Sequence, residues 1–240
     1  MDAPDVARLA ALVDKHSTLD LLSRAQEMCA LCQQATGVTG VALSIAGEGG
    51  TEYGSSTVCG TDALSMRLEE LQLGLAEGPI ADALYTTFPV VAADLADISH
   101  PRWLWFAPAA VEAGAGALFV FPVCLGQRCL GALSLYRSTS GDLTVEQFDD
   151  LVALADAAAV ILLTGYANVD KEPGAWALGV GTGFLPEVPQ AVGAIASELG
   201  VDAEHALARL RGHAFAEAQS ISQVAHEVVA KRLRLEPDAA

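Results

Sequence analysis

The chain has 240 residues, a net charge of −17 and a hydrophobic content of 52%, with only 18% charged residues. This composition excludes a disordered chain and indicates a folded protein with one large domain or two smaller ones. Residues 1–170 carry 7 basic and 21 acidic side chains, so this part is not expected to bind nucleic acid by itself.

The first residues, MDAPDVARLA, show no export signal, because they are acidic and lack an apolar core. The most apolar run, residues 151–165, contains Asp156 and is shorter than the roughly 20 residues that a bilayer crossing needs. An odd number of cysteines, five, favours reduced thiols over a disulfide framework. We therefore expect a soluble, cytoplasmic protein.

Helix and strand patterns alternate along the first part of the chain. Residues 17–37 predict a helix that has Ser17 as its N-cap and ends before Gly37. The next predicted elements are a strand at 38–46, a turn at 47–50, a strand at 51–60, a helix at 61–73, a short helix after Gly78-Pro79 and a strand at 89–94.

The clearest hairpin spans residues 117–138, where two β-rich runs flank Gly126-Gln127. Both runs are too apolar for either face to be fully exposed. A final helix is predicted at 144–165. Helices around hairpin-linked strands indicate an α+β domain with an antiparallel sheet over residues 1–165.

Residues 166–185 are rich in Gly and Pro and show no periodicity, which is typical of an interdomain linker. Three short amphipathic patterns follow. The second begins at Asp202 as N-cap, and the third begins with Ser220 and Gln223 at the spacing of a capping box. We predict an all-α three-helix bundle over residues 186–236.

One motif in each predicted helix of this bundle carries a family resemblance: QAxG at 190–193, ALxxLRxHAF at 206–215 and VAxxVVAxRLR at 224–234. Together they resemble the ANTAR domain, a three-helix module that binds RNA hairpins and prevents transcription termination. The resemblance covers nearly all of residues 187–235 and implies structured leader RNA as a partner.

The preceding part carries EGPIADAL (77–84), PVVAADL (89–95) and the segments 102–123 and 130–137. These segments resemble a GAF domain of the kind fused to ANTAR in actinobacterial regulators. The resemblance implies a PAS-like fold that senses a small ligand or mediates dimerisation.

Two positions depart from these families. Relatives often carry a cysteine after the EGP motif, where this chain has Ile80, so a reactive or ligand-binding thiol is absent. Many ANTAR domains have a basic residue between the Ala and Gly of the first helix, where this chain has Val192, which weakens the case for RNA binding.

The resemblance assigns RNA contact to residues of all three helices. The candidates are Gln190, Ala191, Gly193, Arg209, Arg211, His213, Lys231 and Arg234. We expect the third helix to continue to Leu235, so that Glu227, Lys231 and Arg234 share one face and Arg232 falls on the apolar side.

Each of these candidates also has a structural interpretation. The cations near the end of the third helix are suited to interact with the C-terminal end of the helix dipole. Ala191 and Gly193 are also typical of helix crossings, and His213 of a half-buried helix position.

Aromatic residues of the front domain are candidates for lining a ligand cavity, which is usually concave and apolar. They are Trp103, Trp105, Phe106, Phe119, Phe121 and Tyr136. An ordinary hydrophobic core would use the same residues.

Cys29 and Cys32 form a C-x-x-C on a predicted helix, and no second pair completes a zinc site, so we interpret them as small buried hydrophobes. Cys124 and Cys129 flank the hairpin turn and are able to approach each other, although the cytoplasm disfavours a disulfide. The sequence shows no paired catalytic motif and no metal-ligand spacing. We therefore expect no enzyme activity, cofactor or metal.

The leading hypothesis is a GAF–ANTAR regulator. Its front domain senses a small molecule or pairs two copies into a homodimer, and its tail binds leader RNA hairpins to control termination. The first alternative is a dimerisation or protein-docking module with a degenerate ANTAR domain that does not bind RNA. The second is a GAF-type redox enzyme that uses Cys124 and Cys129.

Overall fold

The structure is a computed structural model. It describes residue 7 and residues 9–11, 13–14, 20–46, 56–97, 102–169 and 187–235. The predicted cap at Ser17, the predicted turn at 47–50 and residues 170–185 of the predicted linker lie outside the described residues.

A five-stranded antiparallel sheet forms the centre of the front part, in the order β2-β1-β5-β4-β3. Its strands are β1 (Gly40–Ile45), β2 (Ser56–Gly60), β3 (Val90–Ala92), β4 (Ala117–Leu125) and β5 (Arg128–Arg137). The β4–β5 hairpin turns at Gly126, whose φ of 62° suits a residue without a side chain. The predicted antiparallel sheet and its hairpin are confirmed.

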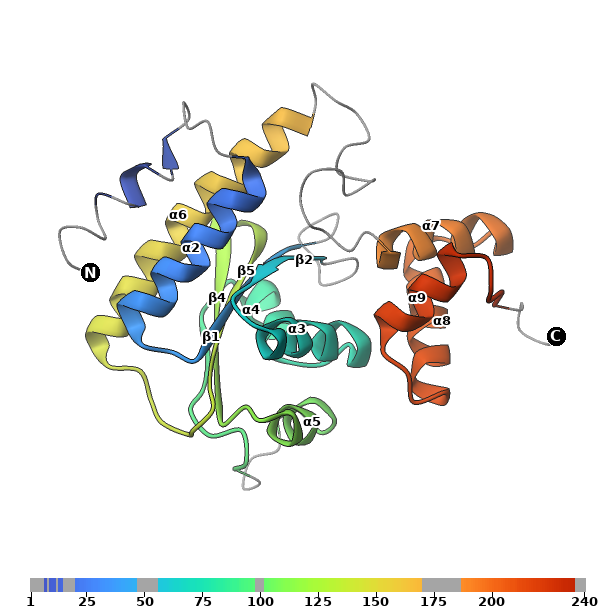
Figure 1. The fold of residues 1–240 in the computed structure, drawn as a ribbon, viewed down its shortest axis with the longest axis horizontal. Helices are drawn as coiled ribbons and strands as arrows, with labels where there is room; N and C mark the ends of the chain where they lie inside the picture. The colour runs from blue at the N-terminus through green and yellow to red at the C-terminus, as the bar shows by residue number, and fades with distance from the viewer. Residues whose placement is uncertain are drawn as a thin grey trace.

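Two long helices lie side by side on one face of the sheet, α2 (Leu21–Thr36) and α6 (Val145–Val169) (Figure 1). They bury Met28 and Leu151 against Phe119 and Phe121 of β4. The N-cap of helix α2 is Asp20, whose carboxylate accepts a hydrogen bond from the Ser23 amide at 2.7 Å. Among the helices that the structure describes, none is long and apolar enough to span a membrane.

Three shorter helices cover the opposite face: α3 (Ala63–Leu75), α4 (Pro79–Thr86) and α5 (Phe106–Ala113). They bury Leu68, Ile80 and Phe106 against Tyr136 of β5. Residues alternate between the two faces along β4, because successive side chains of a strand point in opposite directions. The sheet is therefore covered on both sides, as its apolar strands predict.

The C-terminal part contains three helices, α7 (Glu187–Leu199), α8 (Ala203–Ala216) and α9 (Ile221–Val229). They contact one another around a hydrophobic cluster that includes Ile195, Leu210 and Val224. The helices lie beside α3, and Leu73 of α3 packs against the same cluster (Figure 1).

The last helix is shorter than predicted. It begins with the predicted capping box, in which Ser220 and Gln223 exchange hydrogen bonds of 3.0 and 3.2 Å. However, it ends at Val229, and Lys231 has a left-handed φ of 58° that no helix continues through. The prediction that the helix reaches Leu235 is therefore wrong.

Gly131 tests the close packing of the central strands. A Cβ atom added there would collide with the carbonyl oxygen of Ser44 on β1. We expect Gly131→Ala to lower the free energy of unfolding by about 1–3 kcal/mol, the usual cost of overpacking. Urea unfolding measures this difference. In the control Gly193→Ala, where the new Cβ meets nothing within 4 Å, stability should rise by up to about 1 kcal/mol through helix propensity. Equal stability of Gly131→Ala and the parent protein would contradict the strand packing.

Candidate functional site

The RNA-binding candidates do not form one continuous patch. On α8, Arg209 and His213 are four residues apart and share one side of the helix, whereas Arg211 lies roughly opposite, at about 200° from Arg209. On α7, Gln190 is half-buried and Gly193 is exposed, with nothing within 4 Å of its added Cβ. Most of these candidate residues are therefore accessible enough to contact a ligand at the surface.

Ala191 departs from the expectation of close approach to RNA. Its side chain has no accessible surface and lies in the cluster that joins the three helices, beside Ile195 and Leu210. A buried methyl group cannot touch a ligand, so the structure supports the helix-crossing interpretation for this residue.

Two of the three basic residues after α9 pair with acidic side chains. The Arg232 guanidinium donates two hydrogen bonds to Glu227, at 2.7 and 2.8 Å, and is exposed rather than on the apolar side as predicted. The Nε of Arg234 lies 3.4 Å from a carboxylate oxygen of Glu198 on α7. Within the described part of the chain, Lys231 is exposed and makes no ion pair.

Arg211 points to the front domain. Its Nε donates a hydrogen bond of 2.7 Å to the carbonyl oxygen of Leu73, in the last turn of α3. Nearby, the Ser222 amide donates to a carboxylate oxygen of Glu70 at 3.4 Å. The rings of Trp105 and Phe215 meet edge to face, with centroids 6.2 Å apart. A predicted RNA-binding residue thus takes part in the contact between the two parts of the chain.

The six aromatic candidates do not line a common cavity. Phe119 and Phe121 lie on the α2–α6 side of the sheet, whereas Trp103, Phe106 and Tyr136 lie on the α3–α5 side. The sixth, Trp105, is 63% exposed. Five of the six are core residues, as the interpretation of an ordinary hydrophobic core expects.

A different, polar cavity lies under α3. It measures about 20 Å³, room for about one water molecule. Ser44 and Thr57 of the sheet, Glu69 and Gln72 of α3, and Arg211 of α8 contribute to its wall. The sequence signal for it is weak, because Glu69 stands beside the apolar stripe of α3 like any surface acid, and Arg211 is more than a hundred residues away.

Glu69 is the unusual group of this cavity. It is only 4% exposed, and its Oε1 makes no hydrogen bond within the described residues. Burial raises the pKa of Glu69 to about 7, and the hydroxyl groups of Ser134 and Ser44 oppose this shift only in part. A carboxyl group that changes charge near neutral pH therefore lies in the wall next to Arg211.

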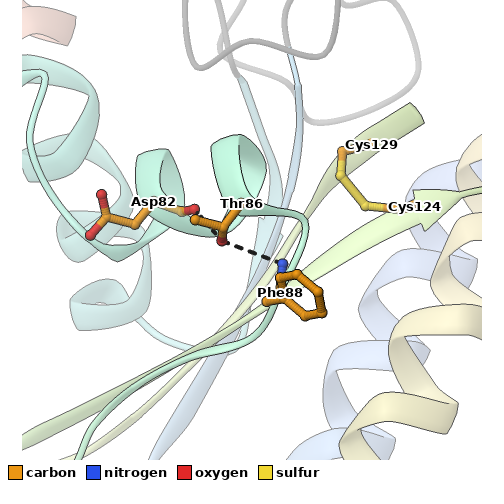
Figure 2. Close-up of a disulfide and its surroundings, with 5 residues drawn as sticks. All are labelled: Asp82, Thr86, Phe88, Cys124 and Cys129. Atoms are coloured by element: carbon orange, nitrogen blue, oxygen red, sulfur yellow. Dashed lines mark hydrogen bonds between the residues drawn. A yellow bond between two sulfur atoms is a disulfide. The ribbon is translucent and has the colours of Figure 1, made fainter. Parts of the chain in front are cut away.

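The cysteines divide into two groups. Cys29 and Cys32 on α2 are fully buried, and burial raises the pKa of the Cys32 thiol, so both are the small core residues that were predicted. Cys124 and Cys129 form a disulfide between opposite residues of the β4–β5 hairpin (Figure 2). This corrects the expectation of reduced thiols, because the strand register brings their Cα atoms to 3.8 Å.

The helix before β3 ends near this hairpin. Thr86 donates from its hydroxyl to the carbonyl of Asp82 at 2.7 Å and accepts from the amide of Phe88 at 3.4 Å (Figure 2).

The described residues contain no group of three or more His, Cys, Asp or Glu side chains arranged to hold a metal ion.

Comparison with known proteins identifies the front part. The family model described as GAF domain matches residues 20–162. The fold is similar to the GAF domain of a phosphoenolpyruvate-protein phosphotransferase from Coxiella burnetii, at 17% identity and a TM-score of 0.54, over 69% of this chain and 96% of that one. It is also similar to the GAF domain of the corresponding Acinetobacter protein, at 14% identity and a TM-score of 0.51, over 70% and 97% of the two chains. No curated protein matches the sequence.

The pKa of Glu69 predicts a pH-dependent stability. The folded protein keeps a proton that an unfolded carboxyl, with its ordinary value of 4.5, has already released, so this contribution to stability is lost as pH rises from 4.5 through about 7. Urea unfolding should therefore find Glu69→Gln close to the parent protein near pH 4.5. Above pH 7 the variant should be more stable by up to about 3 kcal/mol.

Glu146→Gln, at an exposed position of α6, is the matched control and should not change the pH profile. A difference between Glu69→Gln and the parent protein that stays constant across this pH range would contradict the buried, protonated carboxyl.

Proposed function

The chain belongs to the GAF family, and we propose that it is a signal-responsive regulator whose C-terminal helices bind structured RNA and control transcription termination. The observation that carries the proposal is the set of three ANTAR-like motifs, of which the first two lie on α7 and α8 and the third begins on α9 and continues past its end at Val229. These helices share one hydrophobic cluster, so the motifs belong to a single folded unit.

The polar side chains of α8 suit RNA chemistry. RNA hairpins are recognised through unpaired loop bases and phosphates, which call for guanidinium groups and for side chains that stack on or hydrogen-bond to bases. Arg209 and His213 provide such groups one helical turn apart, and the exposed Phe215 offers a ring at the end of the same helix.

Bulk charge contributes little to this proposal. Between residues 187 and 235 five cations stand against six acids, and two of the cations, Arg232 and Arg234, already pair with acids of the same unit. Affinity must therefore come from the placement of individual groups, and from two copies acting together.

Val152, Val160 and Leu163 lie on the outer side of α6 and are 38–42% exposed, and we propose this side for homodimer contact.

For the GAF domain we propose ligand sensing, and the cavity that contains Glu69 has room for a ligand no larger than about one water molecule. Oε1 of this buried carboxyl makes no hydrogen bond among the described residues, which favours a water-sized ligand with a hydrogen-bond donor. We propose a binding role and no catalysis, since Cys124 and Cys129 are joined and the remaining thiols are buried.

The alternative is a docking module that does not bind RNA. Its support is the contact of α8 and α9 with α3, which shows that these helices present a surface able to hold protein. Val192, in place of a basic residue, also favours it.

Replacing Arg209 and Lys231 together by alanine distinguishes the two functions. Each lost charge-assisted contact should weaken binding to a pool of RNA hairpins by about tenfold or more, and the slope of affinity against salt should fall. Fluorescence anisotropy at several salt concentrations measures both. Arg128→Ala, an exposed cation at the far end of the hairpin, is the control for net charge and should leave binding unchanged. Absence of binding to every hairpin of the pool by the parent protein would favour the docking module.

A further inference from the structure

Arg211, a candidate for RNA contact, has a backbone carbonyl of the front domain as an acceptor. The carbonyl of Leu73 belongs to the last turn of α3, where four carbonyl groups lack partners within the helix. The helix dipole adds about half a negative charge at this end. The end of α3 therefore presents to Arg211 a partly negative oxygen, as a phosphate of RNA would.

The start of α9 is held in a similar way. The amide of Ser222 is one of the first N–H groups of the helix, which point outward and favour anions. Its acceptor is the carboxylate of Glu70, at 3.4 Å. Two donors of the C-terminal unit thus engage acceptors on a single helix of the sensor domain.

The remainder of this interface is slight. Trp105 and Phe215 touch only edge to face, and they remain 63% and 68% exposed. Ile221 reaches α3 at Gly74, where a Cβ atom would lie 3.9 Å from its side chain. Contacts between domains of one chain commonly open and close unless they are large and apolar, and this one rests on Leu73, Ile221 and a few polar groups.

We propose that the docked arrangement is an inhibited state, in which the carboxyl end of α3 and RNA compete for Arg211 and for the start of α9. The inference rests on the proposed RNA binding. It also assigns a route for the signal, because Glu69 lies one helical turn before Leu73 on α3 and shares the wall of its cavity with Arg211. A proton or a water molecule in that cavity acts directly beside the contact.

A disulfide lock tests the competition in the full chain. The Cβ atom added at Gly74 lies 4.0 Å from the Cβ of Ile221, within the range of about 3.5–4.5 Å for a disulfide. The variant Gly74→Cys with Ile221→Cys should, when oxidised, bind the hairpin RNA pool about tenfold or more weaker than the same variant after reduction, the loss expected for one charge-assisted contact.

The controls separate the lock from other effects of the reductant. Each single cysteine variant should bind equally with and without reductant, which accounts for the cost of changing Ile221 in the core. The parent protein under the same two conditions reports the effect of opening the Cys124–Cys129 disulfide.

A variant that separates α3 from α9 should increase RNA binding, the opposite of the effect of the oxidised lock. The tyrosine in Gly74→Tyr is too large for the gap to Ile221 and should separate α3 from α9, which raises the affinity for the RNA pool. Gly74→Ala, whose methyl group makes an ordinary contact, should bind like the parent protein.

The outcomes distinguish this inference from the function on which it rests. Equal RNA binding by the oxidised and reduced lock would overturn inhibition and leave RNA binding intact. Absence of binding in the parent protein, the reduced lock and Gly74→Tyr would remove RNA binding, and inhibition with it.

Discussion

The burial of β4 and β5 on both faces is the constraint from which the arrangement of the front domain follows. Nearly every residue of these two strands is inaccessible, so helices must cover both sides of the sheet. Helices α2 and α6 take one side, and α3, α4 and α5 take the other. Helix α3 contacts both the sheet and α8, so it connects the core of the front domain with the C-terminal helices.

The same packing explains why an acid is buried. Helix α3 lies against the sheet through Leu68, and Glu69 follows it directly, so the carboxyl is carried under the helix toward Ser44 and Ser134. The energetic cost of placing a carboxylate there is reduced when it binds a proton. A proton or water molecule at this point therefore acts on Glu69 of α3, the same helix whose last turn accepts the hydrogen bond from Arg211.

Much of the fold could be predicted from the sequence, because its signals are local. The glycine after α2, the turn at Gly126 and the capping box of Ser220 are set by neighbouring residues, and the structure places them as expected. The end of α9 could not be predicted, because an ion pair between Glu227 and Arg232 and a left-handed Lys231 replace the next helical turn. The distribution of the aromatic residues over the two faces of the sheet could not be predicted for a related reason. Spacing along one strand does not tell which face of the sheet another strand or helix will use.

The contact at Arg211 also gives a reason for the acidic composition of a protein with a proposed RNA-binding tail. A strongly acidic front domain repels RNA, and its helix α3 offers the Leu73 carbonyl and the Glu70 carboxylate to donors of the tail. On binding RNA, Arg211 would exchange the partly negative Leu73 carbonyl for a phosphate. The net free energy of RNA binding would then be small and would depend on how strongly α3 holds Arg211. With five cations against six acids, the tail has little charge to spare, and a small shift of α3 is enough to decide the outcome. Acidic charge in the sensor domain is, in this view, part of the control and not merely a solvated surface.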